Sequence, residues 1–538
     1  MNRWHALLLV VALACSLNVV ADDDGHHHEN LTTEQLGAVH FPVSCVTEVQ
    51  QPFERGVALL HSFWYEEAEK QFTQVTKDDP HCAMAHWGVA MSLWHELWDH
   101  PEAKTIKRGQ AEVKKAKSLH SRDDRERSYI AAMDAFYGGP KERDYQSRAD
   151  GYSKAMEQLY GHHPEDQEAA VFYGLSLLAS APDGDTTFAH QKQAAAVLEK
   201  VFAEAPDHPG VAHYLIHSYD SPQMAQLGLP AARRYAKIAP AAPHALHMPS
   251  HIFARLGLWQ DDIDSNLASV AATRKTAAMH MGGGGHQFHA MDFLQYAYLQ
   301  SGRDTEAQQL IDEVNAMPEM KEDMYGDFDP HVYAMIVFSA RYVLEMHHWS
   351  DAANLAPVPG ASLRNTSFIH WARAIGAART GNPAQAHKEA AEIDSIRTKL
   401  LRDKKTYSAE GARRDFEEAE AWANYADGKH DEALKALRAV AEKEEAEGDE
   451  PLAIPAREML ADMLLDMNQP VQAFAEYETD LKFNPNRFDG LYGAAHAAEL
   501  ADKRDQANTY YAQLLKVCDG SKSDRPELSH ARALLAQK

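Results

Sequence analysis

A pattern of small, aromatic and proline residues that recurs about every 34 positions constrains the fold of this chain more than any other feature. Its first copy lies in residues 56–80 and comprises Gly56, Tyr65, Ala68, Phe72 and Pro80. A small residue lets one helix approach another closely, and a proline stops the second helix. A unit of this kind cannot bury its apolar face alone, so successive copies must stack.

The pattern returns along most of the chain. Further copies are GKHDEALKALRAV, with Gly428, Ala433, Leu437 and Val440; NQPVQAFAEYETDLKFNP, with Ala473, Tyr477 and Pro485; and DKRDQANTYYAQLL, with Ala507 and Tyr511. Glycine at 257, 302 and 381 marks the turn between two helices, because it accepts a positive φ. About nine or ten copies fit between residues 49 and 517, and a repeat array of that length predicts a solenoid.

This spacing resembles that of the tetratricopeptide repeat (TPR) family. The resemblance implies an all-α fold, an α-solenoid in which helical hairpins form a right-handed superhelix. It also implies that the first helix of each hairpin lines the concave wall, the usual ligand surface. The segments HYLIH, HMPSHIF and CAMAHWGVAM resemble a group of exported bacterial TPR proteins.

We expect six segments along the chain. They are a signal peptide (1–21), an acidic and histidine-rich segment (22–48), N-terminal TPR-like units with an insertion (49–210), central histidine-rich units (211–300), C-terminal units (301–520) and a tail or capping helix (521–538). Residues 88–165 fit the period poorly, and GGGG at 282–285 interrupts another unit. Such departures are where function tends to be grafted onto a regular array.

The N-terminus predicts export. Arg3 precedes a short apolar run, and Val19-x-Ala21 precedes an acidic stretch, which is the pattern of a secretory signal peptide cleaved after Ala21. The mature chain would then be periplasmic or secreted. A lipid-anchored form would need Cys15 at the cleavage point, where the preceding residues fit poorly.

Charge and hydropathy limit the partners. The net charge of −26 argues against nucleic acid, which selects for basic surface, and is compatible with a cationic partner or metal ion. No segment after the N-terminus has about 18 uninterrupted apolar residues, so we expect no integral membrane segment in the mature chain.

Cysteine usage fits an oxidising compartment. Cys45 and Cys82 each lie near one end of the first predicted hairpin and could form a disulfide, although two unpaired buried thiols are the alternative. Cys518 would be left without a partner.

Histidines fall in register with the repeat. His213 and His217 form an i,i+4 pair that recurs one period later as His247 and His251. Each pair lies on one helix face, and neighbouring helices pack about 8–10 Å apart. A third segment carries His286 and His289, and one carboxylate follows by about a turn in two of the segments. We therefore expect a cluster that comprises His213, His217, His247, His251, His286, His289, Asp220 and Asp292.

Such a cluster is a competent transition-metal site, for zinc or copper. Interleaved thioethers (Met248, Met279, Met281 and Met291) make Cu(I) conceivable, and DDDGHHHEN is a second metal-binding tract. The alternative is that these histidines are structural residues copied with the repeat.

Two functions follow from these features. The first is a scaffold that binds a protein or small ligand in its concave groove, with a metal at the centre. The second is a metal-dependent hydrolase or oxidoreductase, in which the metal activates water, Asp220 or Asp292 serves as base or ligand, and Tyr214, Ser250 and Arg255 bind substrate. HELWDH at 95–100 is not a zincin motif, and neither a G-x-S-x-G elbow nor a phosphate-binding loop is visible.

Overall fold

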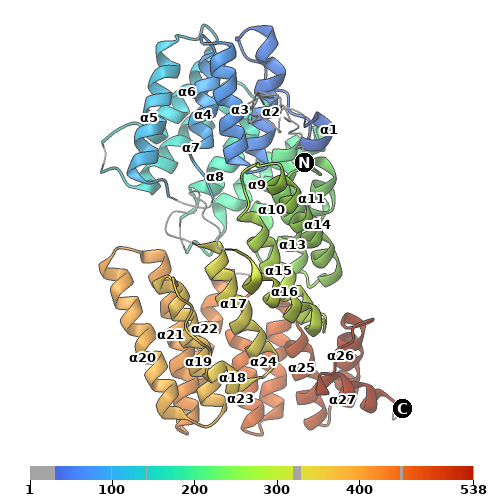
Figure 1. The fold of residues 1–538 in the computed structure, drawn as a ribbon. Coiled ribbons are helices and arrows are strands. Elements are labelled where there is room, and N and C mark those ends of the chain that lie inside the picture. The colour runs from blue at the N-terminus through green and yellow to red at the C-terminus, as the bar shows by residue number, and fades with distance from the viewer. Residues whose placement is uncertain are drawn as a thin grey trace, which may run out of the picture.

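The computed structural model describes residues 31–97, 100–140, 142–182, 184–318, 329–448 and 452–536, and these form helices joined by turns and loops, without a strand. Successive helices form antiparallel hairpins that stack side by side from the N-terminus to the C-terminus (Figure 1). The predicted signal peptide, Cys15 and the DDDGHHHEN tract lie outside the described residues. No helix among those described is long and apolar enough to span a bilayer.

The N-terminal part follows a short entry segment. Its elements are α1 (Thr33–Leu36), the 3-10 turn η2 (Thr47–Val49), α2 (Gln50–His61), α3 (Tyr65–Asp78), α4 (Ala83–Ser92), α5 (Ala103–Ser118), α6 (Asp124–Tyr137), α7 (Tyr145–His162), α8 (Gln167–Ala179) and α9 (Ala189–Glu204). Residues 88–165, which fit the period poorly, are part of the array. They supply α5, α6 and α7, and the longer connections before α5 and between α6 and α7 disturb the period.

The central part carries the histidine-rich segments. Its helices are α10 (Pro209–Tyr219), α11 (Ala225–Ile238), α12 (Pro243–His247), α13 (Pro249–Arg255), α14 (Trp259–Ala278), α15 (His286–Gln300) and α16 (Asp304–Ala316). Helices α12 and α13 follow one another directly and are separated at Pro249, which has no N–H to donate to the preceding turn.

The C-terminal part continues the array. Its helices are α17 (Pro330–Glu345), α18 (Trp349–Ala353), α19 (Leu363–Arg379), α20 (Pro383–Arg402), α21 (Thr406–Ala426), α22 (His430–Glu447), α23 (Ala456–Asp466), α24 (Pro470–Phe483), α25 (Phe488–Leu500), α26 (Arg504–Val517) and α27 (Pro526–Leu535). The last helix packs on α26, at the position expected of a capping helix.

Close packing at small residues explains the hairpin stack. The Phe72 ring lies between Gly56 and Gly88, where an added Cβ would come within 2.7 Å and 2.3 Å of it respectively. The turn glycines Gly257, Gly302 and Gly381 adopt φ of +62°, +67° and +75°. The all-α TPR-type solenoid predicted from the repeat is confirmed.

The hairpins form two layers. The first helix of a hairpin is buried around most of its circumference, as in α8, where every residue from Glu168 to Ala179 is buried. The second helix buries one stripe, as in α9, where the buried residues are Ala194, Ala195, Val197, Leu198 and Val201. The first helices therefore make an inner layer, which carries the histidine segments.

The superhelix coils tightly enough for distant hairpins to meet. Helix α2 contacts α10, and the Trp64 indole donates to the carbonyl of Gly282, 2.9 Å away. Further along, α15 contacts α25, and the Trp259 indole donates to the carbonyl of Asn486 at 2.8 Å. The contacts of α2 with α10 and of Trp64 with Gly282 bring residues from α2 and its turn against the central histidines.

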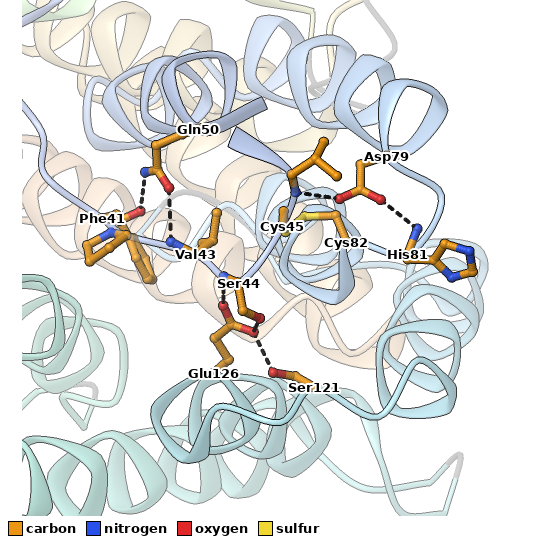
Figure 2. The surroundings of a disulfide bond; sticks show 12 residues. Phe41, Val43, Ser44, Cys45, Gln50, Asp79, His81, Cys82, Ser121 and Glu126 are labelled. Atoms are coloured by element: carbon orange, nitrogen blue, oxygen red, sulfur yellow. Dashed lines mark hydrogen bonds between the residues drawn. A yellow bond between two sulfur atoms is a disulfide. The ribbon is translucent and has the colours of Figure 1, made fainter. Parts of the chain in front are cut away.

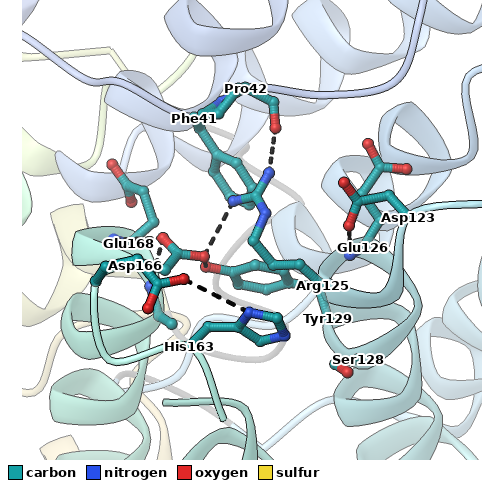
Figure 3. Close-up of polar contacts among 12 residues, drawn as sticks. Phe41, Pro42, Asp123, Arg125, Glu126, Ser128, Tyr129, His163, Asp166 and Glu168 are labelled. Carbon is teal, nitrogen blue, oxygen red and sulfur yellow. Dashed lines mark hydrogen bonds and ion pairs between the residues drawn. The ribbon is translucent and has the colours of Figure 1, made fainter.

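The entry segment before α2 is fixed by contacts at Phe41, Val43 and Cys45. Cys45 and Cys82 form a disulfide with an S–S distance of 2.04 Å, and Gln50 bonds to the backbone of Phe41 and Val43 nearby (Figure 2). On the other side, Arg125 pairs with Asp166 at 3.0 Å and lies over the Phe41 ring (Figure 3). The free thiol of Cys518 is buried far along the chain.

The packing of Phe72 predicts a large difference between two glycine substitutions. Gly88→Ala should lower the free energy of unfolding by about 1–3 kcal/mol, because the new methyl group overlaps the Phe72 ring. Gly161→Ala, also in a helix, meets no atom within 4 Å and should be neutral or slightly stabilising. Chemical denaturation of both variants tests this, and equal midpoints would refute the packing argument.

Candidate metal centre

Six histidines of the inner layer form two groups of three. The first triad comprises His213, His217 and His244, and the second comprises His247, His251 and His289. Within each triad, one ring nitrogen of every histidine lies within 4.8 Å of the others. Each triad combines an i,i+4 pair with one histidine from the next inner helix.

The first triad is held by the backbone of α2. The Nδ1–H of His213 donates to the carbonyl oxygen of His61 at 2.6 Å, which leaves Nε2 without a proton in the neutral ring. That Nε2 lies 3.2 Å from Nε2 of His217 and 3.1 Å from Nε2 of His244. Two ring nitrogens thus converge on a third that carries no proton.

The second triad is held by two side chains. His247 donates from Nδ1 to the Asn266 carboxamide oxygen at 2.7 Å, and His251 donates from Nδ1 to Asp220 at 2.8 Å. Asn266 presents its oxygen because its amide nitrogen donates to Asp262. In neutral rings the two Nε2 atoms are therefore both unprotonated, and they face each other at 3.1 Å.

One phenyl ring packs against each triad. Phe63, in the turn after α2, has ring-centroid distances of 4.3, 5.7 and 5.5 Å to His213, His217 and His244. Phe293, in α15, lies 4.9, 4.5 and 5.4 Å from His247, His251 and His289. Both phenyl rings are buried, so each fixes the orientation of three imidazoles and excludes water from one side.

This geometry fits a metal ion. Nitrogens bound at about 2.0–2.1 Å to a tetrahedral zinc lie about 3.3 Å from one another, close to the 3.1–3.2 Å seen here. Two facing lone pairs repel, and a shared cation removes that repulsion. Histidine ligands usually donate their second N–H to a carboxylate, an amide or a backbone carbonyl, and all three occur here.

Burial favours the neutral form of five of the six triad imidazoles, His213, His217, His244, His247 and His289. Desolvation, reinforced by His251, lowers the pKa of His217 to about 3. The same cause places the pKa values of His213, His244 and His247 well below the usual range. Desolvation also lowers the pKa of His289 to about 3, although its ring is the most exposed of the six. Neutral imidazole is the form that binds metal.

Asp220 supports the cluster without belonging to either triad. Its carboxylate accepts from His251 Nδ1 at 2.8 Å and from Arg255 Nε at 3.0 Å. Burial opposes ionisation, but attraction to Arg255 and His251 outweighs it and holds the Asp220 pKa far below its usual range. The predicted ligand is therefore a positioning residue in this structure.

Asp292 lies elsewhere, contrary to prediction. It pairs with Arg341 at 2.7 Å and accepts from the Tyr333 hydroxyl at 3.0 Å, because its side of α15 faces α17. His286 is adjacent to the cluster, with its ring centroid 5.4 Å from that of His244, but it joins neither triad. Desolvation, followed by repulsion from His95, lowers the His286 pKa to about 4.

The three predicted substrate-binding residues are buried in protein contacts. The Tyr214 hydroxyl bonds to His61 Nδ1 at 3.0 Å, and the Ser250 hydroxyl lies 3.3 Å from His247 Nδ1. Arg255 is used by Asp220 and by the carbonyl of Gly448. In this arrangement all three stabilise the surroundings of the histidines, and their role in substrate binding stays a prediction.

Several residues of the site were not predicted. His244 was visible in HALHMPSH, three residues before His247 on the same helix face. Phe63 and His61 come from a hairpin about 150 residues earlier, and no local pattern connects them to the cluster. The thioethers of Met248, Met281 and Met291 are buried in the apolar core.

No protein-family model matches the chain, and no curated protein matches it. Among solved structures, a human IFIT1 dimer with m7Gppp-AAAA aligns at 11% identity over 86% of this chain and 95% of IFIT1, with a TM-score of 0.36. A monomeric IFIT1 mutant with Gppp-AAAA aligns at 11% identity over 85% and 95%, with a TM-score of 0.37. Scores this low carry no argument about function, which rests on the site itself.

The position of Asp292 leads to a prediction. Asp292→Asn should lower the free energy of unfolding by about 3 kcal/mol, because it leaves the buried Arg341 charge without its counter-ion. It should leave metal content unchanged. Asp207→Asn is the control, since the Asp207–Arg234 pair is exposed and should contribute less than about 1 kcal/mol. Loss of metal in Asp292→Asn without loss of stability would restore Asp292 as a ligand.

Proposed function

We propose that this chain is an exported TPR-type scaffold that binds a transition metal, zinc or copper, at the two histidine triads. The convergence of one ring nitrogen from each of three histidines in each triad, with Nδ1 of His213, His247 and His251 already used, is the observation that carries the proposal. In the second triad the Nε2 atoms of His247 and His251 face each other without a proton between them, a contact that a purely structural role does not explain.

The ligand set favours zinc or copper. Both triads are made of imidazoles alone, without a carboxylate or a thiolate. Imidazole suits zinc and copper, whereas calcium, magnesium and manganese prefer oxygen ligands. The net charge of −26 also favours the approach of a cation.

Burial restricts what else can bind at the site. His213, His244 and His247 are almost fully buried, while His217 and His251 are partly exposed and His289 is exposed. A peptide could not contact most of these rings. A metal held by three imidazoles would keep a coordination position for water or a small molecule, which favours a small ligand over a protein at the site.

The same open position supports a second candidate function, a metal-dependent hydrolase or oxidoreductase. Three protein ligands with one exchangeable position is the arrangement of catalytic zinc sites. Asp220 is engaged by His251 and Arg255, so a general base would have to come from a residue outside the triads.

Export is supported by the Cys45–Cys82 disulfide, since such bonds persist in oxidising compartments. The N-terminal segment with the pattern of a signal peptide supports the same localisation, periplasmic or secreted.

Metal content tests the proposal. Untagged protein purified from the export compartment should contain zinc or copper by mass spectrometry, and His217→Ala/His251→Ala should reduce it about tenfold or more. His370→Ala is the matched control, because His370 is also partly buried but pairs with Glu389 outside the cluster. Metal-free wild-type protein that also fails to take up added zinc or copper would overturn the proposal.

A further inference from the structure

We propose that the two triads are separate metal sites that together form a dinuclear centre. This inference rests on the proposed function, since it assumes that the histidines bind metal. It goes further by assigning two ions to each chain and a small oxygen-donor ligand, such as water or hydroxide, between them.

The two triads have the same arrangement, an i,i+4 histidine pair and one histidine from the next inner helix. In the first, the i,i+4 pair His213 and His217 on α10 is joined by His244 from α12. In the second, His247 and His251 are joined by His289 from α15. The pairs are 34 residues apart, so the solenoid repeats the site with its hairpins.

Each triad is complete by itself. The paired Nε2 atoms are 3.2 Å apart in the first triad and 3.1 Å apart in the second. The first residue of each pair donates its Nδ1–H to a protein oxygen, His213 to the His61 carbonyl and His247 to Asn266. Since no ligand is shared, filling one triad leaves three ligands for a second ion.

Each triad also packs against a phenyl ring of its own, which forms one wall of the site. Phe63 contacts all three rings of the first triad, and Phe293 contacts all three rings of the second. The two walls come from helical hairpins that lie far apart in the sequence. A single six-histidine site for one ion would not need two such walls.

The triads are close neighbours. The ring centroids of His244 and His247 are 6.0 Å apart, and those of His217 and His251 are 6.3 Å apart. Rings at this separation leave room for two ions that share one small ligand, as in two-metal sites with ions about 3.5–4 Å apart.

Asp220 connects the two sites. It follows α10, the helix that carries His217 of the first triad, and accepts from His251 of the second. Its negative charge, held in place by Arg255, lies beside both positions and offsets part of the repulsion between two cations.

The stoichiometry of binding tests the inference. The full chain with His26→Ala/His27→Ala/His28→Ala, which removes the N-terminal metal-binding tract, is the wild-type reference for the variants below. Stripped of metal and titrated with zinc, it should bind two ions by native mass spectrometry. His217→Ala and His289→Ala each disable one triad, at a half-buried ring and at an exposed ring respectively, and each variant should bind one ion tightly. The double variant should bind none, while His370→Ala should still bind two. Circular dichroism establishes that each variant is folded.

Loading with Cu(II) tests the proximity of the ions. Two coupled Cu(II) ions should give an electron paramagnetic resonance signal smaller than their copper content, or a half-field transition. The one-copper variants should give the full signal of an isolated ion, because the partner ion is gone.

The outcomes separate the two proposals. One ion in the wild type, lost in either variant, would overturn the dinuclear centre and leave the proposed function standing. Two ions with the signal of isolated coppers would also overturn it, as would two ions retained in folded versions of both variants. No bound ion in the wild type would overturn the proposed function itself.

Discussion

Close approach of the inner helices is the constraint on which the rest of the structure depends. Gly56 and Gly88 lie against the Phe72 ring, and in the central part Gly210 of α10 lies against the His61 ring of α2, so small residues set how near these helices lie. Because the helices are close, an i,i+4 histidine pair on one can meet a single histidine from the next. Because the coil is tight, the α2 turn reaches the cluster and contributes both the Phe63 ring and the His61 carbonyl. A wider superhelix would leave the same histidines apart.

Burial determines what those imidazoles can do. Desolvation keeps His213, His244 and His247 neutral, so they remain available as ligands over the whole physiological range of pH. Unprotonated nitrogens that face one another are costly without a cation, and a bound ion would stabilise the fold by an amount that grows with its affinity. The solenoid is thus both the support of the centre and the part that would gain stability from the metal.

The sequence predicted the fold and the position of the histidine cluster better than it predicted which residues form the cluster. The 34-residue period was sufficient for the solenoid, and it placed His213, His217, His247 and His251 together, because a repeat fixes the helix face of every copy. The period could not place Asp292. This residue lies three positions after His289, on the side of α15 that faces α17, and it forms an ion pair with Arg341 there. The contacts of Phe63 and Asn266 with the histidines could not be predicted for a different reason. Phe63 comes from a distant turn of the superhelix and Asn266 from the outer layer, and neither contact follows from local spacing.

X-ray absorption at the metal edge, on protein loaded with zinc or copper, tests the central claim most directly. The account predicts a first shell dominated by about three imidazole nitrogens per ion at about 2.0 Å, recognisable by multiple scattering from the imidazole rings. A shell of oxygen or sulfur ligands without that imidazole signature would contradict it, because the ion would then lie outside the two triads.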